Sequence, residues 1–256
     1  MCGINGFNFK NQALIKEMVE ATKHRGPDGR GFYIDDEISL GHNLLAITDT
    51  PVDGRQPFFS PDKNFVLIYN GEIYNYKELK EELKSKGRQF HTQGDTEVLL
   101  QGLMDQGIGF IEKLDGMFAF AFLDKRAGKL YFARDRMGIK PIYYHYKNGR
   151  FIFSSELKGI LAHGIDRKLD LGALNIFFML GYVPGPKTLI KEVHKVCPGQ
   201  ILTLDLNNRT LSEMWFGHKE RFSDQNEFNP NYLRELIGQS VSAHTIGLRP
   251  FGLYLS

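Results

Sequence analysis

The sequence predicts an α+β protein in which two β-sheets stack face to face and helices cover the outer faces. Strand-like segments recur along most of the chain, whereas helical patterns gather in a few places. Residues 117–123 alternate phenylalanines with small or flexible apolar side chains, as expected for an inner strand that is buried on both faces. Together these observations favour a helix–sheet–sheet–helix sandwich.

Composition argues against several function classes. The formal net charge is +2, so no electrostatic argument favours nucleic acid or an acidic membrane as a partner. Cys2 and Cys197 are too few for a disulfide framework, and no cluster of histidines and cysteines indicates a metal. The N-terminus lacks a signal-peptide pattern, and no apolar tract approaches the ~20 residues that span a bilayer. The expected location is therefore the cytoplasm.

Periodicity predicts the individual elements. A helix at residues 76–86 would follow Asn75 as its cap, and a helix at residues 96–106 would follow Asp95. Further helices are predicted at residues 13–23 and 156–161. Strands are predicted at residues 3–9, 38–42, 65–69, 117–123, 129–134, 142–146, 150–154 and 200–205.

Two Asn-Gly pairs suggest tight turns. Asn70-Gly71 lies between strand-like runs, which is the strongest short-range signal of a β-hairpin. Residues 147–149, which end in Asn148-Gly149, are predicted as a second hairpin turn. Residues 24–29 (HRGPDG) are predicted as a glycine-rich turn.

The pattern changes after about residue 166. Residues 169–181 are helical in pattern, and the polar residues 213–229 resemble a linker. Asn229 followed by Pro230 predicts the start of an amphipathic helix at residues 230–244. A strand is predicted at residues 251–255, and no segment of this chain is a candidate to pair with it.

Cys2 is the leading candidate nucleophile because of its position. Once Met1 is removed, Cys2 carries both a thiol and the free α-amine of the chain. The amine titrates near ~8 and the thiol near ~8.5, so the amine can act as a base toward its own thiol, directly or through one water. The alternative is that a cysteine follows the initiator methionine by accident, and the Met-Cys pair alone does not exclude it.

Two other segments have both a structural and a functional interpretation. Asn70 and Gly71 form either a hairpin turn or an oxyanion hole made by the Asn70 side-chain amide and the Gly71 backbone N–H. Asp95 is either a helix cap, the more common role for an isolated aspartate there, or a ligand for a substrate ammonium group.

The order of the motifs is more specific than any single motif. They are Cys2-Gly3-Ile4, HRGPDG, a strand ending at Asp49 followed by GRQP, NGEIYNY, GDTEVLL, MFAFAF, RDRMGIKPIYY and SSELKGIL. This series closely resembles the glutamine-hydrolysing half of asparagine synthetases, a class II glutamine amidotransferase domain of the N-terminal-nucleophile hydrolase family. The resemblance implies that family's four-layer αββα sandwich. It assigns no catalytic role to RDRMGIKP.

The resemblance also implies a domain organisation. The amidotransferase domain would occupy residues 2–165, and a bridge and linker residues 166–228. Residues 229–256 would be the truncated start of an α/β nucleotide-binding synthetase domain. Leu255 and Ser256 match the edge of its nucleotide site, the rest of which this sequence does not contain.

The resemblance implies a role for each matching residue. Cys2 would be the nucleophile and its α-amine the base, while Asn70 and Gly71 would form the oxyanion hole. The residues implied to line the glutamine pocket are Leu44, Ile47, Thr48, Glu72 and Asp95, the last two as ligands of the glutamine α-ammonium.

Leu44 departs from the family pattern. Family members usually carry an arginine here, which pairs with the glutamine α-carboxylate, whereas this chain reads His42-Asn43-Leu44-Leu45. Either glutamine binding is weakened, or another side chain binds the carboxylate. The candidates for that replacement are Asn43, Arg30 and Arg55.

The predicted function is hydrolysis of glutamine, whose ammonia serves ATP-dependent synthesis of asparagine from aspartate in the full-length enzyme. ATP and Mg²⁺ are implied only for the missing synthetase domain, and no cofactor or metal is expected in the part present. The expected partner is glutamine, with neither nucleic acid nor membrane, and the resemblance is compatible with a full-length homodimer. Two alternatives stay open: an amidotransferase for another carboxylate, for example in surface-sugar modification, and a degenerate, non-catalytic domain suggested by Leu44.

Overall fold

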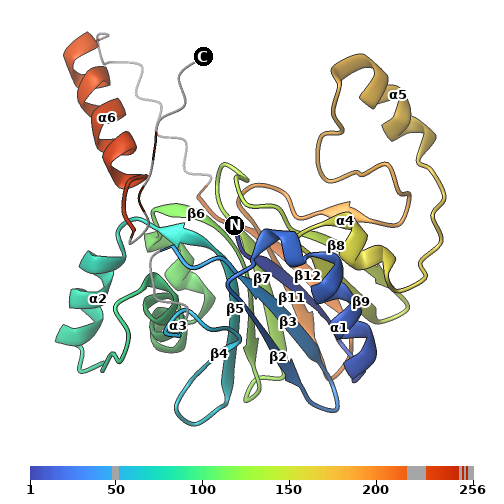
Figure 1. The fold of residues 1–256 in the computed structure, drawn as a ribbon, viewed down its shortest axis with the longest axis horizontal. Coiled ribbons are helices and arrows are strands. Elements are labelled where there is room, and N and C mark those ends of the chain that lie inside the picture. The colour runs from blue at the N-terminus through green and yellow to red at the C-terminus, as the bar shows by residue number, and fades with distance from the viewer. Residues whose placement is uncertain (48–51, 218–228, 248–249, 251, 253–256) are drawn as a thin grey trace.

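The chain folds into two stacked antiparallel sheets of six strands each, with helices on both outer faces (Figure 1). The structure is a computed structural model that describes residues 1–47, 52–217, 229–247, 250 and 252. The four layers confirm the predicted α+β sandwich.

The first strand of the chain lies inside the first sheet. β1 (Gly3–Phe7) lies between β3 (Ser39–Leu44) and β9 (Arg150–Ser154). Helices α1 (Gln12–Ala21) and α4 (Leu157–Leu161) pack on the outer face through a cluster that includes Phe7, Met18 and Ile160. The strand order is β10 (His194–Lys195), β8 (Tyr143–Lys147), β9, β1, β3 and β2 (Gly29–Ile34).

The second sheet supplies the opposite wall. Its long central strands are β5 (Phe65–Ile73) and β6 (Gly116–Asp124), and helices α2 (Tyr76–Ser85) and α3 (Asp95–Gln106) cover its outer face. The strand order is β12 (Leu211–Trp215), β11 (Gln200–Asp205), β7 (Lys129–Arg134), β6, β5 and β4 (Phe58–Phe59).

β6 confirms the prediction of a strand buried on both faces. Its phenylalanines Phe118, Phe120 and Phe122 pack under the helices of the second sheet. The intervening Ala119, Ala121 and Leu123 belong to a separate cluster that fills the space between the two sheets. Because successive side chains of a strand point to opposite faces, the alternation MFAFAFL supplies two cores at once.

The predicted hairpin at Asn70-Gly71 is wrong. Both residues lie inside β5, which pairs with β6 without interruption from Phe65 to Ile73. A two-residue hairpin turn of type I′ needs positive φ at both central residues, and neither Asn70 nor Gly71 has one. The same dipeptide does turn the chain at Asn148-Gly149, where φ is 51° and 74° and Lys147 pairs with Arg150.

Asn75 precedes α2 as predicted but does not cap it with its side chain. Its amide donates instead to the Lys113 carbonyl, and its side-chain oxygen accepts from the Asp115 N–H. These bonds tie the start of α2 to the chain that leads into β6. By contrast, Asn229 caps the helix after it in the ordinary way, because its side chain accepts from two N–H groups of the first turn.

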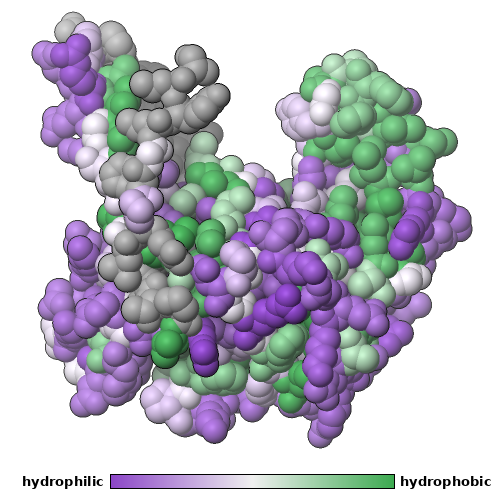
Figure 2. Space-filling view, viewed as in Figure 1, coloured by the Kyte–Doolittle hydropathy of each residue, from purple (hydrophilic) through white to green (hydrophobic). Residues whose placement is uncertain are grey.

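Residues beyond the predicted boundary at 165 contribute to both sheets. β10 joins the first sheet, and β11 and β12 extend the second, so residues 213–215 belong to a strand where the sequence suggested a linker. The domain boundaries themselves stay predictions. Helices α5 (Leu171–Leu180) and α6 (Pro230–Ala243) extend from the body in Figure 1, and Figure 2 shows apolar surface over α5. The predicted strand at residues 251–255 lies outside the described residues.

His42 links the two sheets and makes stability depend on pH. It is fully buried on β3, and its Nε2 lies 3.1 Å from the Tyr69 carbonyl oxygen on β5. Burial lowers the pKa of His42 to about 4 from 6.5. The unfolded chain therefore binds a proton that the folded chain excludes when the pH falls from 6.5 toward 4, and stability present above pH 6.5 is lost across that interval.

We expect the free energy of unfolding to fall by about 3 kcal/mol as this histidine titrates. Urea unfolding of wild type and His42→Gln between pH 4.5 and 7.5 checks the effect, because the variant should have a shallower pH slope. His91→Gln, at an exposed histidine, is the matched control and should keep the wild-type slope. An unchanged slope in His42→Gln would contradict this assignment.

Candidate active site

A small cavity lies beside Cys2, at the end of the sandwich where β1 begins. Its volume is about 40 Å³, and its walls come from the segments before β1, after β3, along β5 and at the start of α3. The lining residues include Cys2, Leu44, Ile47, Asn70, Gly71, Glu72, Asp95 and Lys140. The fold thus brings together seven predicted site residues from four separate stretches of sequence. Met1 also lines the cavity, so its removal would enlarge the space.

The Cys2 thiol is held by the backbone of Leu45. The Leu45 N–H donates to Sγ at 3.4 Å, and Sγ lies 3.6 Å from the Leu45 carbonyl oxygen. Burial raises the pKa of the Cys2 thiol, whereas the Leu45 N–H and nearby positive charge lower it. Burial is the largest of these effects and raises the pKa of the thiol above its ordinary value, so the thiol needs a base close by. The α-amine exposed by loss of Met1 would be on the same residue.

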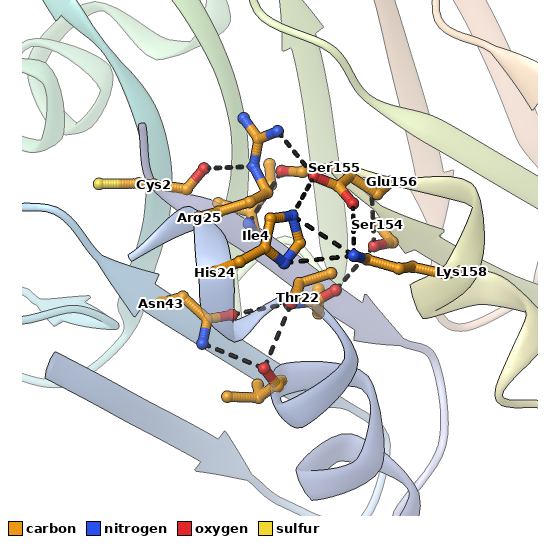
Figure 3. Close-up of polar contacts among 12 residues, drawn as sticks. Cys2, Ile4, Thr22, His24, Arg25, Asn43, Ser154, Ser155, Glu156 and Lys158 are labelled. Carbon is orange, nitrogen blue, oxygen red and sulfur yellow. Dashed lines mark hydrogen bonds and ion pairs between the residues drawn. The ribbon is translucent and has the colours of Figure 1, made fainter. Parts of the chain in front are cut away.

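The backbone of Cys2 is fixed from behind by charged residues (Figure 3). Arg25 donates through Nε to the Cys2 carbonyl oxygen at 2.9 Å and through a terminal nitrogen to Glu156 at 3.0 Å. His24 and Lys158 also contact Glu156, and the Cys2 sulfur points away from this cluster. Arg25 and Glu156 lie in the HRGPDG and SSELKGIL motifs, so the motifs signalled them, but only the fold shows that they meet behind Cys2.

Asn70 and Glu72 face the cavity because β5 runs straight through this region. Residues two apart on a strand share a face, so Ile68 packs between the sheets and Asn70 and Glu72 follow it toward Cys2. Asn70 is 1% exposed, and its amide nitrogen Nδ2 is buried without a hydrogen-bond partner among the described residues. An unpaired buried donor on a residue that lines a cavity beside a nucleophile is suited to binding an oxyanion.

Gly71 is required by the packing of β5 on β6. A Cβ atom at this position would lie 2.3 Å from the Met117 carbonyl oxygen, so no larger residue fits without a backbone shift. The extended backbone here excludes the alternative of a turn. The oxyanion-hole interpretation of Asn70 and Gly71 stays a prediction, and the geometry is compatible with it.

The two predicted acidic residues differ in their surroundings. Asp95 is 2% exposed and accepts from the Tyr69 hydroxyl at 2.7 Å and the Ile73 N–H at 2.9 Å, so it is anchored to β5. The Glu72 side chain makes no hydrogen bond or ion pair in the part of the chain that the structure describes, and burial raises the pKa of its carboxyl group. Both line the cavity, as a site for an ammonium group requires. Gly94, and not Asp95, occupies the N-cap position of α3.

No replacement for the family's arginine is found among the three candidates. The Asn43 amide is fully buried on the other side of β3, where it bonds to Thr22 and the Val19 carbonyl (Figure 3). Arg30 pairs with Glu20 at the surface, and Arg55 is exposed and does not line the cavity. Leu44 itself is buried in the cavity wall. Thr48, Leu255 and Ser256 lie outside the described residues.

Lys140 is a cavity residue that the sequence analysis missed. It lies in RDRMGIKP, to which the sequence analysis assigned no catalytic role, and it is 5% exposed in the wall beside Cys2 and Glu72. The only sequence signal for Lys140 was its position in one of the ordered motifs, RDRMGIKP. The fold was needed to show that this loop ends at the cavity.

Comparison with known proteins decides the family. A family model described as a glutamine amidotransferase domain matches residues 1–215. The chain belongs to this family. The chain is 38% identical over 241 residues to a protein of Methanocaldococcus jannaschii named putative asparagine synthetase (glutamine-hydrolyzing) 2. It is 37% identical over 268 residues to asparagine synthetase (glutamine-hydrolyzing) 1 of Bacillus subtilis.

These alignments cover 84% and 100% of the chain but only 46% and 42% of the two relatives, so the chain spans less than half of their length. Among solved structures, a glutamine phosphoribosylpyrophosphate amidotransferase from Bacillus subtilis superposes with a TM-score of 0.62 at 20% identity. That alignment covers 85% of this chain and 50% of the other. The likeness confirms the predicted N-terminal-nucleophile fold.

The described residues contain neither a membrane-spanning helix nor a metal-binding cluster. No helix there is long and apolar enough to cross a membrane. No group of three or more histidine, cysteine, aspartate or glutamate side chains is arranged there to bind a metal ion.

Proposed function

We propose that this domain hydrolyses glutamine to glutamate and ammonia, with mature Cys2 as nucleophile and its α-amine as base. The amine takes the thiol proton, and the thiolate attacks the side-chain amide carbon of glutamine. The amine then returns the proton to the departing ammonia, which leaves a thioester at Cys2. Water attacks the thioester, releases glutamate and restores the thiol and amine.

The observation that carries this proposal is the convergence of Cys2, Asn70, Gly71 and Glu72 on one cavity. The tetrahedral intermediate places negative charge on the former amide oxygen. The unpaired Asn70 Nδ2 and the Gly71 N–H would donate to that oxygen in the intermediate. Glu72 and Asp95 would receive the glutamine α-ammonium and so orient the amide toward Cys2.

The fate of the ammonia is the second part of the proposal. Relatives that match the whole chain are named asparagine synthetases, which supports transfer of ammonia to an aspartate activated with ATP and Mg²⁺ in a full-length enzyme. The residues proposed for the edge of the nucleotide site lie outside the described residues. A full-length enzyme carrying this domain should form asparagine from glutamine, aspartate and ATP. Transfer only to a different carboxylate would contradict this part.

Leu44 should weaken glutamine binding. A hydrogen bond to a charged group contributes about 1.5–3 kcal/mol, and leucine offers none to the α-carboxylate. We expect a KM about 10–150-fold above that of an arginine-bearing relative, with kcat less affected because the nucleophile and oxyanion donors are unchanged.

Leu44→Arg should therefore lower the KM of glutamine hydrolysis. Leu44→Met, which preserves size and adds no charge, is the matched control and should leave KM close to wild type. Steady-state kinetics of the three proteins checks this. A wild-type KM already typical of arginine-bearing relatives, with no gain in Leu44→Arg, would show that the site is not weakened.

A further inference from the structure

Lys140 is a buried cation whose ammonium group has no hydrogen-bond or ion-pair partner among the described residues. It is the one cationic side chain among the described residues that line the cavity, and it is 5% exposed. Its Nζ makes no hydrogen bond or ion pair within the described parts of the chain, although Glu72 lines the same cavity. Most buried lysines in proteins are paired, as Lys80 is here through the Thr92 carbonyl and Gln93.

The loop that carries Lys140 is held rigidly. The buried carboxylate of Asp135 accepts the backbone N–H groups of Phe118, Met137, Ile139 and Lys140, at 2.9 to 3.1 Å. Arg134 donates to the carbonyl oxygens of Lys140 and Val196 at 2.8 and 2.7 Å. The position of Lys140 is therefore fixed by two charged side chains that act only on backbone.

An unpaired buried ammonium group costs stability, because it loses its water without gaining a partner. If this position served only packing, an apolar residue here would make the folded protein more stable. A titratable group kept in such a place, on a rigid loop beside a nucleophile, is the pattern of a functional residue.

We propose that Lys140 is a positioning residue that acts electrostatically on Cys2: its ammonium favours loss of one proton from the mature N-terminus, which leaves a neutral α-amine beside the thiol that it deprotonates. This inference rests on the proposed glutaminase site. It gives RDRMGIKP a function, since the motif would place one positive charge beside the nucleophile.

The other charges around the cavity act on the amine and the thiol in both directions. Burial lowers the pKa of the N-terminal amine in the chain that still carries Met1, and the charges of Arg25 and Lys140 lower it further. Arg25 donates hydrogen bonds to the Cys2 carbonyl oxygen and to Glu156, whereas Lys140 lines the cavity. Asp95 and Glu72 oppose the effect, because their negative charges favour the protonated amine and thiol. The remaining ionisable cavity residue, Tyr69, is held by Asp95.

Lys140→Met tests the proposal because it removes the charge and keeps an unbranched side chain. The acid limb of kcat/KM should move to higher pH by about 0.5–1 unit, since the amine and thiol then bind protons more tightly as a coupled pair. The pH profile of Cys2 alkylation by iodoacetamide, measured without glutamine, should shift in the same direction. Lys140→Arg should restore most of the wild-type profile.

Arg136→Met is the matched control. It removes one positive charge from the same loop, but its guanidinium points to Glu112 and the Leu114 carbonyl, away from the cavity. Both of its pH profiles should equal those of wild type. Intact mass must show loss of Met1 in every variant before the profiles are compared.

Three results would overturn the proposal. Unchanged pH profiles in Lys140→Met would show that the charge does not act on Cys2. A raised KM with unchanged profiles would make Lys140 a substrate ligand instead. A lowered melting temperature with unchanged profiles would make it structural, whereas we expect an equal or higher one. If wild type hydrolysed no glutamine, the alkylation profiles would still test Lys140, so the two proposals can fail separately.

Discussion

Cys2→Ala is expected to abolish glutamine hydrolysis, with a loss of about 10⁴-fold or more, because no other group near the cavity can form the thioester. The assay is release of glutamate and ammonia in equal amounts from glutamine. A glutamine-analogue electrophile should label wild type on Cys2, as peptide mass mapping would show, and should not label Cys2→Ala.

Cys197 provides the matched control for this experiment. It is the other cysteine of the chain, and it does not line the cavity. Its backbone N–H donates to the Gln200 side-chain oxygen. Cys197→Ala should retain wild-type hydrolysis and labelling. Labelling on Cys197, or hydrolysis that survives in Cys2→Ala, would contradict the mechanism. Absence of hydrolysis in wild type as well would support the alternative of a degenerate domain.

Asn70→Ala is expected to lower kcat by about 10²–10³-fold with a smaller change in KM, because its amide would donate only to the oxyanion of the intermediate. The buried Nδ2 has no partner among the described residues, so its removal should not break the fold through lost bonds of that nitrogen. Thermal unfolding should therefore change little. Steady-state kinetics and a melting curve on the same preparation separate the two effects.

Asn75→Ala is the control for Asn70, since it removes the same group five positions further along the same stretch of sequence. The Asn75 side chain bonds to the backbone of Lys113 and Asp115, away from the cavity. This variant should lose some stability and keep its kcat. An Asn70→Ala enzyme with wild-type kcat would remove Asn70 from the oxyanion hole.

Local sequence patterns were sufficient to predict most of the fold. The alternation at 117–123 predicted both faces of β6, and β7, β9 and β11 begin and end at the predicted residues. The errors occurred where a local signal competed with pairing over distance. Asn70-Gly71 has the composition of a turn, but nine residues of pairing with β6 keep it extended. Residues 213–215 were included in the predicted linker but belong to β12, which lies at the edge of its sheet and needs only one apolar face.

The order of the motifs predicted the residues of the candidate site. It did not predict the residues that hold them in place. Cys2, Glu72 and Asp95 lie in ordered motifs and converge on the cavity. Arg25 and Glu156 are 131 residues apart, and no local pattern shows that their ion pair lies behind Cys2. Lys140 could not be separated from a surface lysine by sequence, because its burial depends on how Asp135 folds the loop.

A cleavable N-terminal extension tests whether the free α-amine of Cys2 is the catalytic base. The same preparation is assayed for glutamine hydrolysis before and after a protease removes the extension and leaves Cys2 as the first residue. The extension keeps the thiol and removes the free amine, so activity should be absent before cleavage. It should appear after cleavage in proportion to the fraction of chains that intact mass shows to be cleaved. Equal hydrolysis before and after cleavage would show that the amine is not the base.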